Sequence, residues 1–210
     1  MIEILIADDH AIVRRGLKQI LAETKDIVVA GEATNGRETL ELVRQRDWDV
    51  LVLDITMPGR SGLDILKDIR QFRPDLPILV LSMHAEEQFA TRMLKAGADG
   101  YLNKESAPEE LVKAIYKVHG GGKYVSPAQA DRMIGAIAGD QSERPHEVLS
   151  DREFEILCLI ASGKTVSQIA KELCLSVKTI STYRARILEK MRLKTNAELT
   201  HYAIKSGLVN

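Results

Sequence analysis

The first 120 residues repeat one pattern five times: a short apolar run followed by a segment with helical periodicity. The apolar runs occupy residues 2–7, 27–30, 50–55, 78–81 and 100–102. In the segments that follow them, apolar residues recur every three or four positions, as do Leu17 and Leu21. Alternating strands and helices form a parallel sheet covered by helices on both faces, and unbroken apolar runs are typical of strands buried on both sides. The pattern therefore predicts an α/β domain over residues 1–122.

The remainder of the chain shows helical patterns only. Residues 123–148 are predicted to be a linker with a short helix near 127–138, because residues 139–147 are polar and contain Pro145. The second domain, residues 149–210, should hold four helices, near 151–162, 166–173, 177–191 and 196–206. About three residues join the second and third of these helices, as in a helix-turn-helix.

Capping signals support these four helices. Ser176 is placed to cap the third helix, and Gly163 suits a left-handed stop after the first. The other three helices should begin with a capping box, in which a Ser or Thr side chain and a Glu or Gln three residues later bond reciprocally to the backbone. The predicted pairs are Ser150 with Glu153, Thr165 with Gln168, and Thr195 with Glu198.

The charge of the chain is divided between its two halves. Residues 1–122 hold 16 Lys and Arg against 20 Asp and Glu, a net charge of −4, whereas residues 123–210 hold 13 against 10, a net charge of +3. This asymmetry suggests different partners for the two halves. Two cysteines without metal-ligand spacing suggest a reducing compartment, and neither a signal peptide nor a membrane span is visible. We therefore expect a cytoplasmic protein.

Chemically useful side chains stand at the ends of the predicted strands. Asp8 and Asp9 follow the first strand, Asp54 ends the third, Ser82 follows the fourth, and Lys104 follows the fifth. Ligands of doubly wound sheets bind outside the carboxyl ends of the strands, so these five side chains should converge. Carboxylates that lie close together repel unless one takes up a proton or all share a cation, and oxygen ligands suit Mg²⁺.

This constellation fits phosphoryl transfer, which needs an in-line nucleophile, a metal ion and a positive side chain. We assign Asp54 as the nucleophile, since it is the carboxylate on the middle strand. Asp8 and Asp9 would hold the metal, and Lys104 would contact the phosphoryl oxygens. Ser82 would hydrogen-bond the phosphoryl group once it is attached.

At these residues the sequence resembles the receiver domain of two-component response regulators, over roughly residues 1–120. The paired acids, the turn at residues 54–58, Ser82 and Lys104 all stand in that family's order and spacing. The resemblance implies a flavodoxin-like five-stranded parallel sheet of order 2-1-3-4-5. It also implies that Asp54 accepts a phosphoryl group from the phospho-histidine of a sensor histidine kinase.

The receiver resemblance assigns three further roles. The backbone carbonyl of Thr56 would complete the metal site that Asp8, Asp9 and Asp54 begin. Tyr101 occupies the position of a switch aromatic, which would move inward when Ser82 turns toward the phosphoryl group. Thr56 and His84 stand at positions that tune the lifetime of the acyl phosphate.

The helix predicted over residues 177–191 has the two faces that a DNA-recognition helix needs. Ile180, Ile187 and Met191 form its apolar stripe, while small, polar and basic residues form the other face. We predict contacts to base edges from three residues and to phosphates from four. The first group is Lys178, Ser181 and Thr182, and the second is Arg184, Arg186, Lys164 and Thr165.

Residues 149–209 resemble the LuxR-type helix-turn-helix, in particular over the stretches LSDREFEIL and LSVKTISTYRARILEKM. With a receiver in front, the chain is identified as a NarL/FixJ-type response regulator that binds a double-stranded DNA operator. The resemblance implies a homodimer on DNA formed through the last helix, for which Leu199, Ala203 and Ile204 are the candidates.

Two other functions compete with this interpretation. Asp54 and Thr56 after an apolar strand are similar to the nucleophile loop of haloacid-dehalogenase-type phosphatases, but that class places its nucleophile on an early strand under a cap domain, and no cap insertion is visible. A constitutive DNA binder whose receiver only dimerises is the second alternative. A dinucleotide-binding enzyme is disfavoured, because no Gly-x-Gly-x-x-Gly follows the first strand. We therefore expect a switch and not a turnover enzyme.

Overall fold

The computed structural model describes residues 1–57, 61–82, 87–105, 107–126, 130 and 145–209. The chain divides into two compact units, Met1–Gly135 and Ala136–Asn210. The helix predicted near residues 127–138 lies outside the described residues, apart from Ala130.

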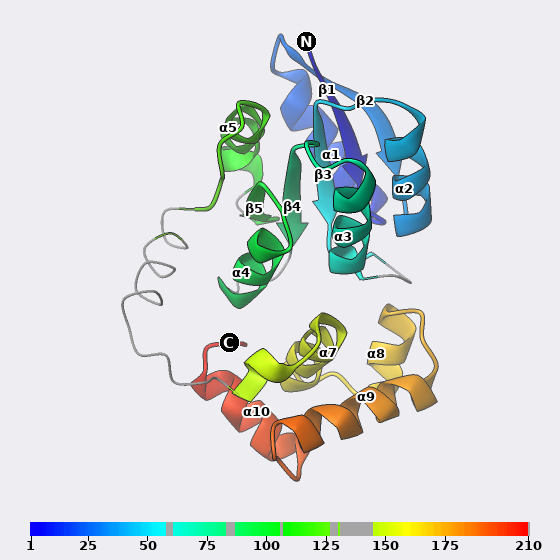
Figure 1. The fold of residues 1–210 in the computed structure, drawn as a ribbon, viewed down its shortest axis with the longest axis vertical. Coiled ribbons are helices and arrows are strands. Elements are labelled where there is room, and N and C mark those ends of the chain that lie inside the picture. The colour runs from blue at the N-terminus through cyan, green and yellow to red at the C-terminus, as the bar shows by residue number, and fades with distance from the viewer. Residues whose placement is uncertain (58–60, 83–86, 106, 127–129, 131–144, 210) are drawn as a thin grey trace. The chain divides into compact units, whose positions relative to one another are not determined.

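The N-terminal unit is built on a five-stranded parallel sheet (Figure 1). Its strands are β1 (Ile2–Ala7), β2 (Ile27–Ala33), β3 (Val50–Asp54), β4 (Ile78–Ser82) and β5 (Gly100–Asn103). They lie in the order β2-β1-β3-β4-β5, which confirms the predicted topology. The registers pair Ala7 with Leu53, Asp54 with Leu81, and Ser82 with Asn103, so the carboxyl ends of β1, β3, β4 and β5 meet at one edge.

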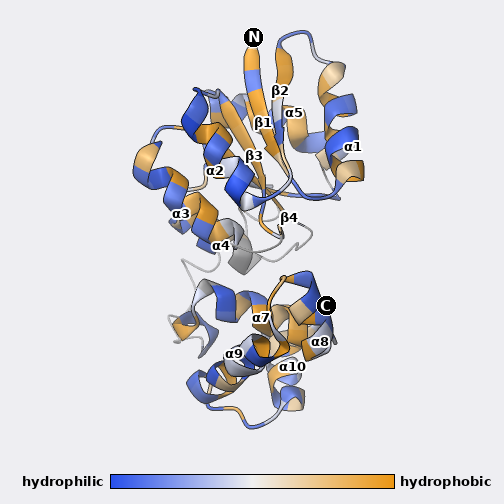
Figure 2. Ribbon diagram, turned by 90° about the vertical axis from the view of Figure 1, so that its right-hand side faces the viewer, coloured by the Kyte–Doolittle hydropathy of each residue, from blue (hydrophilic) through white to orange (hydrophobic). Residues whose placement is uncertain are grey.

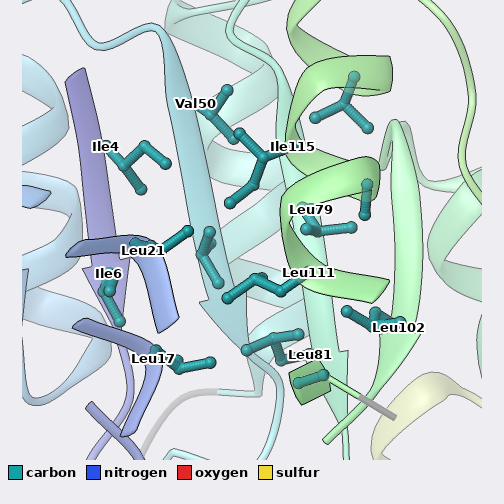
Figure 3. Packing of buried hydrophobic residues seen from close by; sticks show 14 of the residues in the cluster. Ile4, Ile6, Leu17, Leu21, Val50, Leu79, Leu81, Leu102, Leu111 and Ile115 are labelled. Atoms are coloured by element: carbon teal, nitrogen blue, oxygen red, sulfur yellow. The ribbon is translucent and has the colours of Figure 1, made fainter. Parts of the chain in front are cut away.

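Five helices cover this sheet. They are α1 (Ala11–Ala22), α2 (Gly36–Gln45), α3 (Gly62–Phe72), α4 (Glu87–Lys95) and α5 (Ala107–His119). Helices α1 and α5 pack on one face, where Leu17, Leu21, Leu111 and Ile115 form one buried cluster with strand residues such as Ile4 (Figure 3). Each buried side chain of this kind contributes about 1.5–3 kcal/mol relative to an exposed one. Figure 2 shows the result as apolar strands between helices that are polar on their outer sides.

The segment after α5 covers the edge of β5. Gly121, with a φ of 79°, helps to reverse the chain at the end of the helix. Tyr124 then forms a parallel bridge with Gly100: its N–H donates to the Asp99 carbonyl at 2.8 Å, and its carbonyl accepts from the Tyr101 N–H at 2.9 Å. A covered edge cannot pair with another chain. This segment lies within the linker predicted over residues 123–148, and no sequence pattern indicates the bridge.

The C-terminal unit contains, over residues 145–209, a 3-10 helix and four α-helices. These are η1 (Pro145–Val148), α7 (Asp151–Ala161), α8 (Val166–Glu172), α9 (Val177–Lys190) and α10 (Asn196–Lys205). The four predicted α-helices are confirmed to within one residue at each end. His146 of η1 is buried, with its Nδ1 2.6 Å from the Tyr202 hydroxyl of α10. Pro145–Val148 is therefore packed within this unit, although the sequence placed it in the linker.

The predicted caps are present with one exception. Ser150 and Thr165 form complete capping boxes, and Ser176 accepts from the Thr179 N–H. Thr195 accepts from the Glu198 N–H, but the Glu198 carboxylate accepts from the Lys194 N–H at 2.7 Å. The third capping box was therefore wrong: Glu198 reaches past Thr195 to the preceding residue.

All four α-helices of this unit end in a left-handed residue. Gly163 and Gly207 have φ values of 84° and 64°, and the non-glycine residues Cys174 and Arg192 have 52° and 56°. At each of these ends two backbone N–H groups close onto the last turn; for example, Gly163 N–H donates to Ile160 and the next N–H to Leu159. A side chain in this conformation is strained, whereas glycine is not.

Replacing Cys174 by glycine should therefore raise the stability of α8 and α9 by about 0.5–1 kcal/mol. The measurement is native-state hydrogen exchange of the amides of these helices in the full chain. Gly163→Ala is the reverse test, since a Cβ there would meet nothing within 4 Å, so only backbone strain would act. It should lower stability by about 1 kcal/mol. Equal signs for the two variants would contradict this explanation.

Candidate functional site

Lys104 joins two buried carboxylates at the carboxyl edge of the sheet. Its Nζ lies 2.6 Å from Asp54 Oδ2 and 2.7 Å from Asp8 Oδ2. Asp8 and Asp54 are each 1% exposed. The Lys104 N–H donates to the Ser82 carbonyl at 2.8 Å, which fixes the residue beside the end of β4. The structure thus brings Asp8, Asp54 and Lys104 into direct contact. Ser82 ends the neighbouring strand, and Asp9 follows Asp8.

The second oxygen of Asp54 is held by its own loop. Asp54 Oδ1 accepts from the Thr56 N–H at 3.0 Å and from the Thr56 hydroxyl at 2.8 Å. The loop also lies close against the start of α3, because a Cβ on Gly62 would stand 2.4 Å from Ile55 Cα. Asp54 therefore stands before a loop that these contacts hold at Thr56 and at Gly62.

The Asp8–Asp9–His10 turn supplies the rest of the acidic group. Asp8 Oδ1 accepts from the His10 N–H at 2.7 Å, and His10 Nδ1 lies 2.9 Å from Asp9 Oδ1. One ligand atom from each of Asp8, Asp9, His10 and Asp54 lies within 4.8 Å of the others. Asp8 Oδ2 is buried against Lys104 Nζ, and Asp9 Oδ1 is buried against His10 Nδ1. Oxygens of this kind suit a hard cation, so the residues fit Mg²⁺.

Burial and charge act in opposite directions on this group. Burial raises the pKa of Asp54, and the charge of Asp8 adds to that effect, while Lys104 lowers it without cancelling the rise. For Lys104, burial alone would lower the pKa, but the ion pairs with Asp54 and Asp8 outweigh it and raise the pKa. The lysine therefore stays charged, and the carboxylates repel each other less than they would without it.

Ser82 and Tyr101 are both fully buried. Ser82 ends β4 next to Asn103 of β5, and Tyr101 lies earlier on β5. Leu102 belongs to the core under α1 and α5, so the alternation along the strand places Tyr101 on the opposite face. His84 lies outside the described residues.

The outer face of α9 carries most of the residues predicted to bind DNA. Lys178, Ser181, Thr182 and Arg186 are exposed, while Ile180 and Ile187 are buried. The hydroxyls of Ser181 and Thr182 each donate a hydrogen bond to the backbone carbonyl four residues earlier in the helix. This face can therefore reach a groove without disturbing the core.

The remaining predicted residues are more constrained. Arg184 Nε donates to Asn196 Oδ1 at 2.5 Å, Lys164 Nζ pairs with Glu172 at 2.6 Å, and Thr165 caps α8. Of the residues predicted at the dimer interface, Leu199 and Ala203 are fully buried and Ile204 is 56% exposed. Ile204 alone among the three offers its side chain to a partner.

Comparisons with known proteins agree with this geometry. Residues 4–116 match the response regulator receiver domain, and residues 147–203 match the luxR family of bacterial regulatory proteins. The chain is a response regulator of the NarL/FixJ family. As in that family, a receiver domain precedes a LuxR-type helix-turn-helix.

This response regulator has full-length relatives. It is 38% identical over 211 residues to the response regulator UvrY of Escherichia coli strain K12, covering 100% of this chain and 97% of that protein. It is 37% identical to the response regulator GacA of Pseudomonas aeruginosa, covering 100% and 99%. It resembles the structure of RcsB from Salmonella enterica serovar Typhimurium bound to a promoter with the phosphomimetic BeF₃⁻ (TM-score 0.68, 29% identity, 96% and 97% coverage).

The response regulator is thus a transcription regulator, with a receiver that takes its phosphoryl group from a kinase and a LuxR-type domain that binds DNA. Receivers generally bind Mg²⁺ at an acidic pocket, and this chain has such a pocket. No helix among the described residues is long and apolar enough to cross a membrane.

Sequence reasoning missed three residues that the structure places at these sites. His10 follows the acidic pair directly, which was a usable signal. Asn196 orients Arg184, and Tyr124 hydrogen-bonds the backbone of Tyr101. The last two contacts join residues 12 and 23 positions apart, and no local pattern indicates them.

In a metal-free buffer, Asp54→Asn should raise the stability of the N-terminal unit at pH 7, by on the order of 1 kcal/mol. The pKa of Asp54 is raised in the folded state, so the folded protein binds that proton more tightly than the unfolded chain. Stability is therefore lost as pH rises above the unfolded value of about 3.9. The advantage of the variant should vanish below that pH, as urea titrations across pH would show. A constant advantage at all pH values would contradict the assignment.

Lys104→Met should destabilise the N-terminal unit by about 3 kcal/mol, because it leaves two buried carboxylates without a counter-charge. In an Asp54→Asn background the loss should be smaller, which a double-mutant cycle measures. Lys18→Met is the control, since Lys18 pairs with Glu32 at a more exposed position. That variant should cost less than about 1 kcal/mol. A similar loss in both lysine variants would argue against the buried pair.

Proposed function

We propose that Asp54 is the phosphorylated residue, and that a sensor histidine kinase supplies the group from a phospho-histidine. The observation that carries this is the contact of Lys104 with Asp54 at the mouth of the acidic pocket. Asp8, Asp9, the Asp54 carboxylate and the Thr56 carbonyl would hold Mg²⁺. When bound, Mg²⁺ supplies positive charge to the transferring phosphoryl oxygens.

The residues of this chain divide the reaction between them. An Asp54 oxygen forms the bond to phosphorus while the bond from phosphorus to the donor imidazole nitrogen breaks, and its electron pair stays on that nitrogen. The charge of Lys104 lowers the pKa of Asp54 against the effect of burial, which favours the ionised carboxylate. Lys104 would then contact the phosphoryl oxygens. The Thr56 N–H and hydroxyl hold the carboxylate in one orientation while it attacks.

Phosphorylation would then shift a conformational equilibrium. The added phosphoryl oxygens accept a hydrogen bond from Ser82, and Tyr101 follows the movement of the β4 end. Thr56 and His84 would set the lifetime of the acyl phosphate. A shift from 1:99 to 99:1 needs about 5.5 kcal/mol of differential stabilisation. The Tyr101 N–H donates a hydrogen bond to the Tyr124 carbonyl, so a movement of β5 would also move the start of the interdomain segment.

At the C-terminal domain we propose that α9 enters the major groove. Lys178, Ser181 and Thr182 would contact base edges, while Arg184 and Arg186 contact phosphates, with Lys164 and Thr165 at the start of α8 as further phosphate contacts. Two copies would bind successive major grooves, roughly 34–36 Å apart. The two copies would contact each other through α10. Ile204 is exposed there, while the buried Leu199 and Ala203 would hold the helix in position.

The proposed organisation is a receiver over residues 1–122, a linker over 123–148 and a DNA-binding domain over 149–210, with Tyr124 and η1 packed onto the neighbouring domains. Binding to an operator would place the protein in the bacterial cytoplasm. A phosphatase would turn over small phosphomonoesters, and a constitutive DNA binder would act without Asp54. The relatives are regulators, so we propose a switch that performs no turnover on external substrates.

Incubation with acetyl phosphate and Mg²⁺ should add one phosphoryl group to the wild type, measured by intact mass. Asp54→Asn should gain none, and chelation of Mg²⁺ should abolish the adduct. An adduct that persists in Asp54→Asn would place the acceptor elsewhere. Release of phosphate from a general phosphomonoester by the wild type would instead support the phosphatase alternative.

Single alanine variants should separate the two kinds of DNA contact. Lys178→Ala should cost about 1–3 kcal/mol on the preferred operator and relax the sequence preference at one position. Arg186→Ala should weaken binding to all sequences and reduce the salt slope by about 1. Lys164→Ala should cost less, because Lys164 is already paired with Glu172. Lys205→Ala is the control; equal losses for all four variants would contradict the assignment to α9.

A further inference from the structure

We infer that His10 is an additional ligand of the acidic pocket, through Nδ1, and that it gives this site an affinity for divalent ions that favour imidazole nitrogen, such as Co²⁺ and Ni²⁺, that the carboxylates alone would not provide. The inference rests on the metal site of the proposed function. It adds a nitrogen donor to a ligand set that is otherwise made of oxygen.

The position of the imidazole carries this inference. His10 Nδ1 lies 2.9 Å from Asp9 Oδ1 and 3.4 Å from Asp8 Oδ1, on the same side as the Asp54 carboxylate. One ligand atom from each of these four residues lies within 4.8 Å of the other three. His10 Nδ1 and Asp9 Oδ1, 2.9 Å apart, can share a single ion, because two ligand atoms on bonds of about 2.0–2.2 Å lie at most about 4.4 Å apart.

The buried oxygens of the aspartates point to a cation independently of the histidine. Asp8 is 1% exposed, and its Oδ2 lies 2.7 Å from the ammonium of Lys104, which Asp54 shares. Asp9 Oδ1 is buried and faces the His10 ring at 2.9 Å. Three neighbouring carboxylates around one ammonium leave a negative charge that a cation would balance.

Among the described residues, the His10 ring contacts Asp8 and Asp9. His10 is the N-cap residue of α1, yet its side chain makes no capping hydrogen bond and is 61% exposed. Its backbone N–H, and not its ring, holds Asp8 Oδ1. The tautomer with its hydrogen on Nε2 leaves the Nδ1 lone pair directed at the pocket. The ring is thus free to exchange its contact with Asp9 for a bond to a metal ion.

The choice of ion follows from the donor set. Mg²⁺ strongly prefers oxygen ligands and water, whereas imidazole suits the transition metals, whose affinities rise from Mn²⁺ toward Co²⁺ and Ni²⁺. For Mg²⁺ the ring is a competitor, because its contact with Asp9 must be displaced. For Co²⁺ the ring is a ligand. Removing it should therefore weaken the binding of Co²⁺ without weakening the binding of Mg²⁺.

The test is metal binding by the full chain, by isothermal titration with Mg²⁺ and with Co²⁺, for wild type and His10→Ala. The dissociation constant for Co²⁺ should rise about tenfold or more in the variant. That for Mg²⁺ should stay the same or fall. His10→Ala should not disturb folding, because the His10 side chain is exposed. His201→Ala, at an exposed position of α10, controls for adventitious binding to histidine.

Pulsed electron paramagnetic resonance of the Mn²⁺ complex identifies the ligand directly. Protein labelled with ¹⁵N-histidine should show a nitrogen coupling that disappears in His10→Ala and persists in His201→Ala and His84→Ala. Absence of the coupling in the wild type, or its loss only in His84→Ala, would overturn the inference. If the wild type binds neither ion, the metal site of the proposed function fails as well, whereas Mg²⁺ binding without nitrogen coupling removes only the role of His10.

Discussion

The buried ammonium of Lys104 is the contact on which the acidic site depends. Two carboxylates that are almost inaccessible to water could not both remain ionised beside each other without a positive charge. Lys104 supplies it to Asp54 and Asp8 at once, at 2.6 and 2.7 Å. The same charge that reduces the repulsion between the buried carboxylates would also attract a phosphoryl group that approaches Asp54. Stability and chemistry therefore rest on one side chain.

β5 links this site to the rest of the receiver. It ends one residue before Lys104, its Asn103 pairs with Ser82, and its Tyr101 is bonded through the backbone to Tyr124. A change at the acidic pocket would thus have a continuous, hydrogen-bonded strand through which to reach the beginning of the interdomain segment. The bridge at Tyr124 also covers an edge that would otherwise be open to pairing.

The DNA-binding domain follows a different principle, in which local capping defines each helix. Ser150, Thr165, Ser176 and Thr195 each begin a helix, and a left-handed residue ends each one. The short turns that result hold α8 and α9 in a helix-turn-helix and leave one face of α9 exposed. Cys174 and Arg192 adopt a left-handed conformation that costs free energy for a residue with a side chain. The packing of the helices therefore outweighs this backbone strain at the two turns.

The sequence by itself determined the order and type of nearly every element, because hydrophobic periodicity and capping residues act within a few positions of the chain. It also indicated that Asp8, Asp9, Asp54 and Lys104 would lie close together, since the ends of parallel strands must meet at one edge. Only the tertiary structure decided the contacts between distant segments. Tyr124 on β5, His146 against Tyr202, Asn196 on Arg184 and the burial of Leu199 and Ala203 depend on how helices and strands pack, and packing is a property of the folded chain that no local pattern encodes.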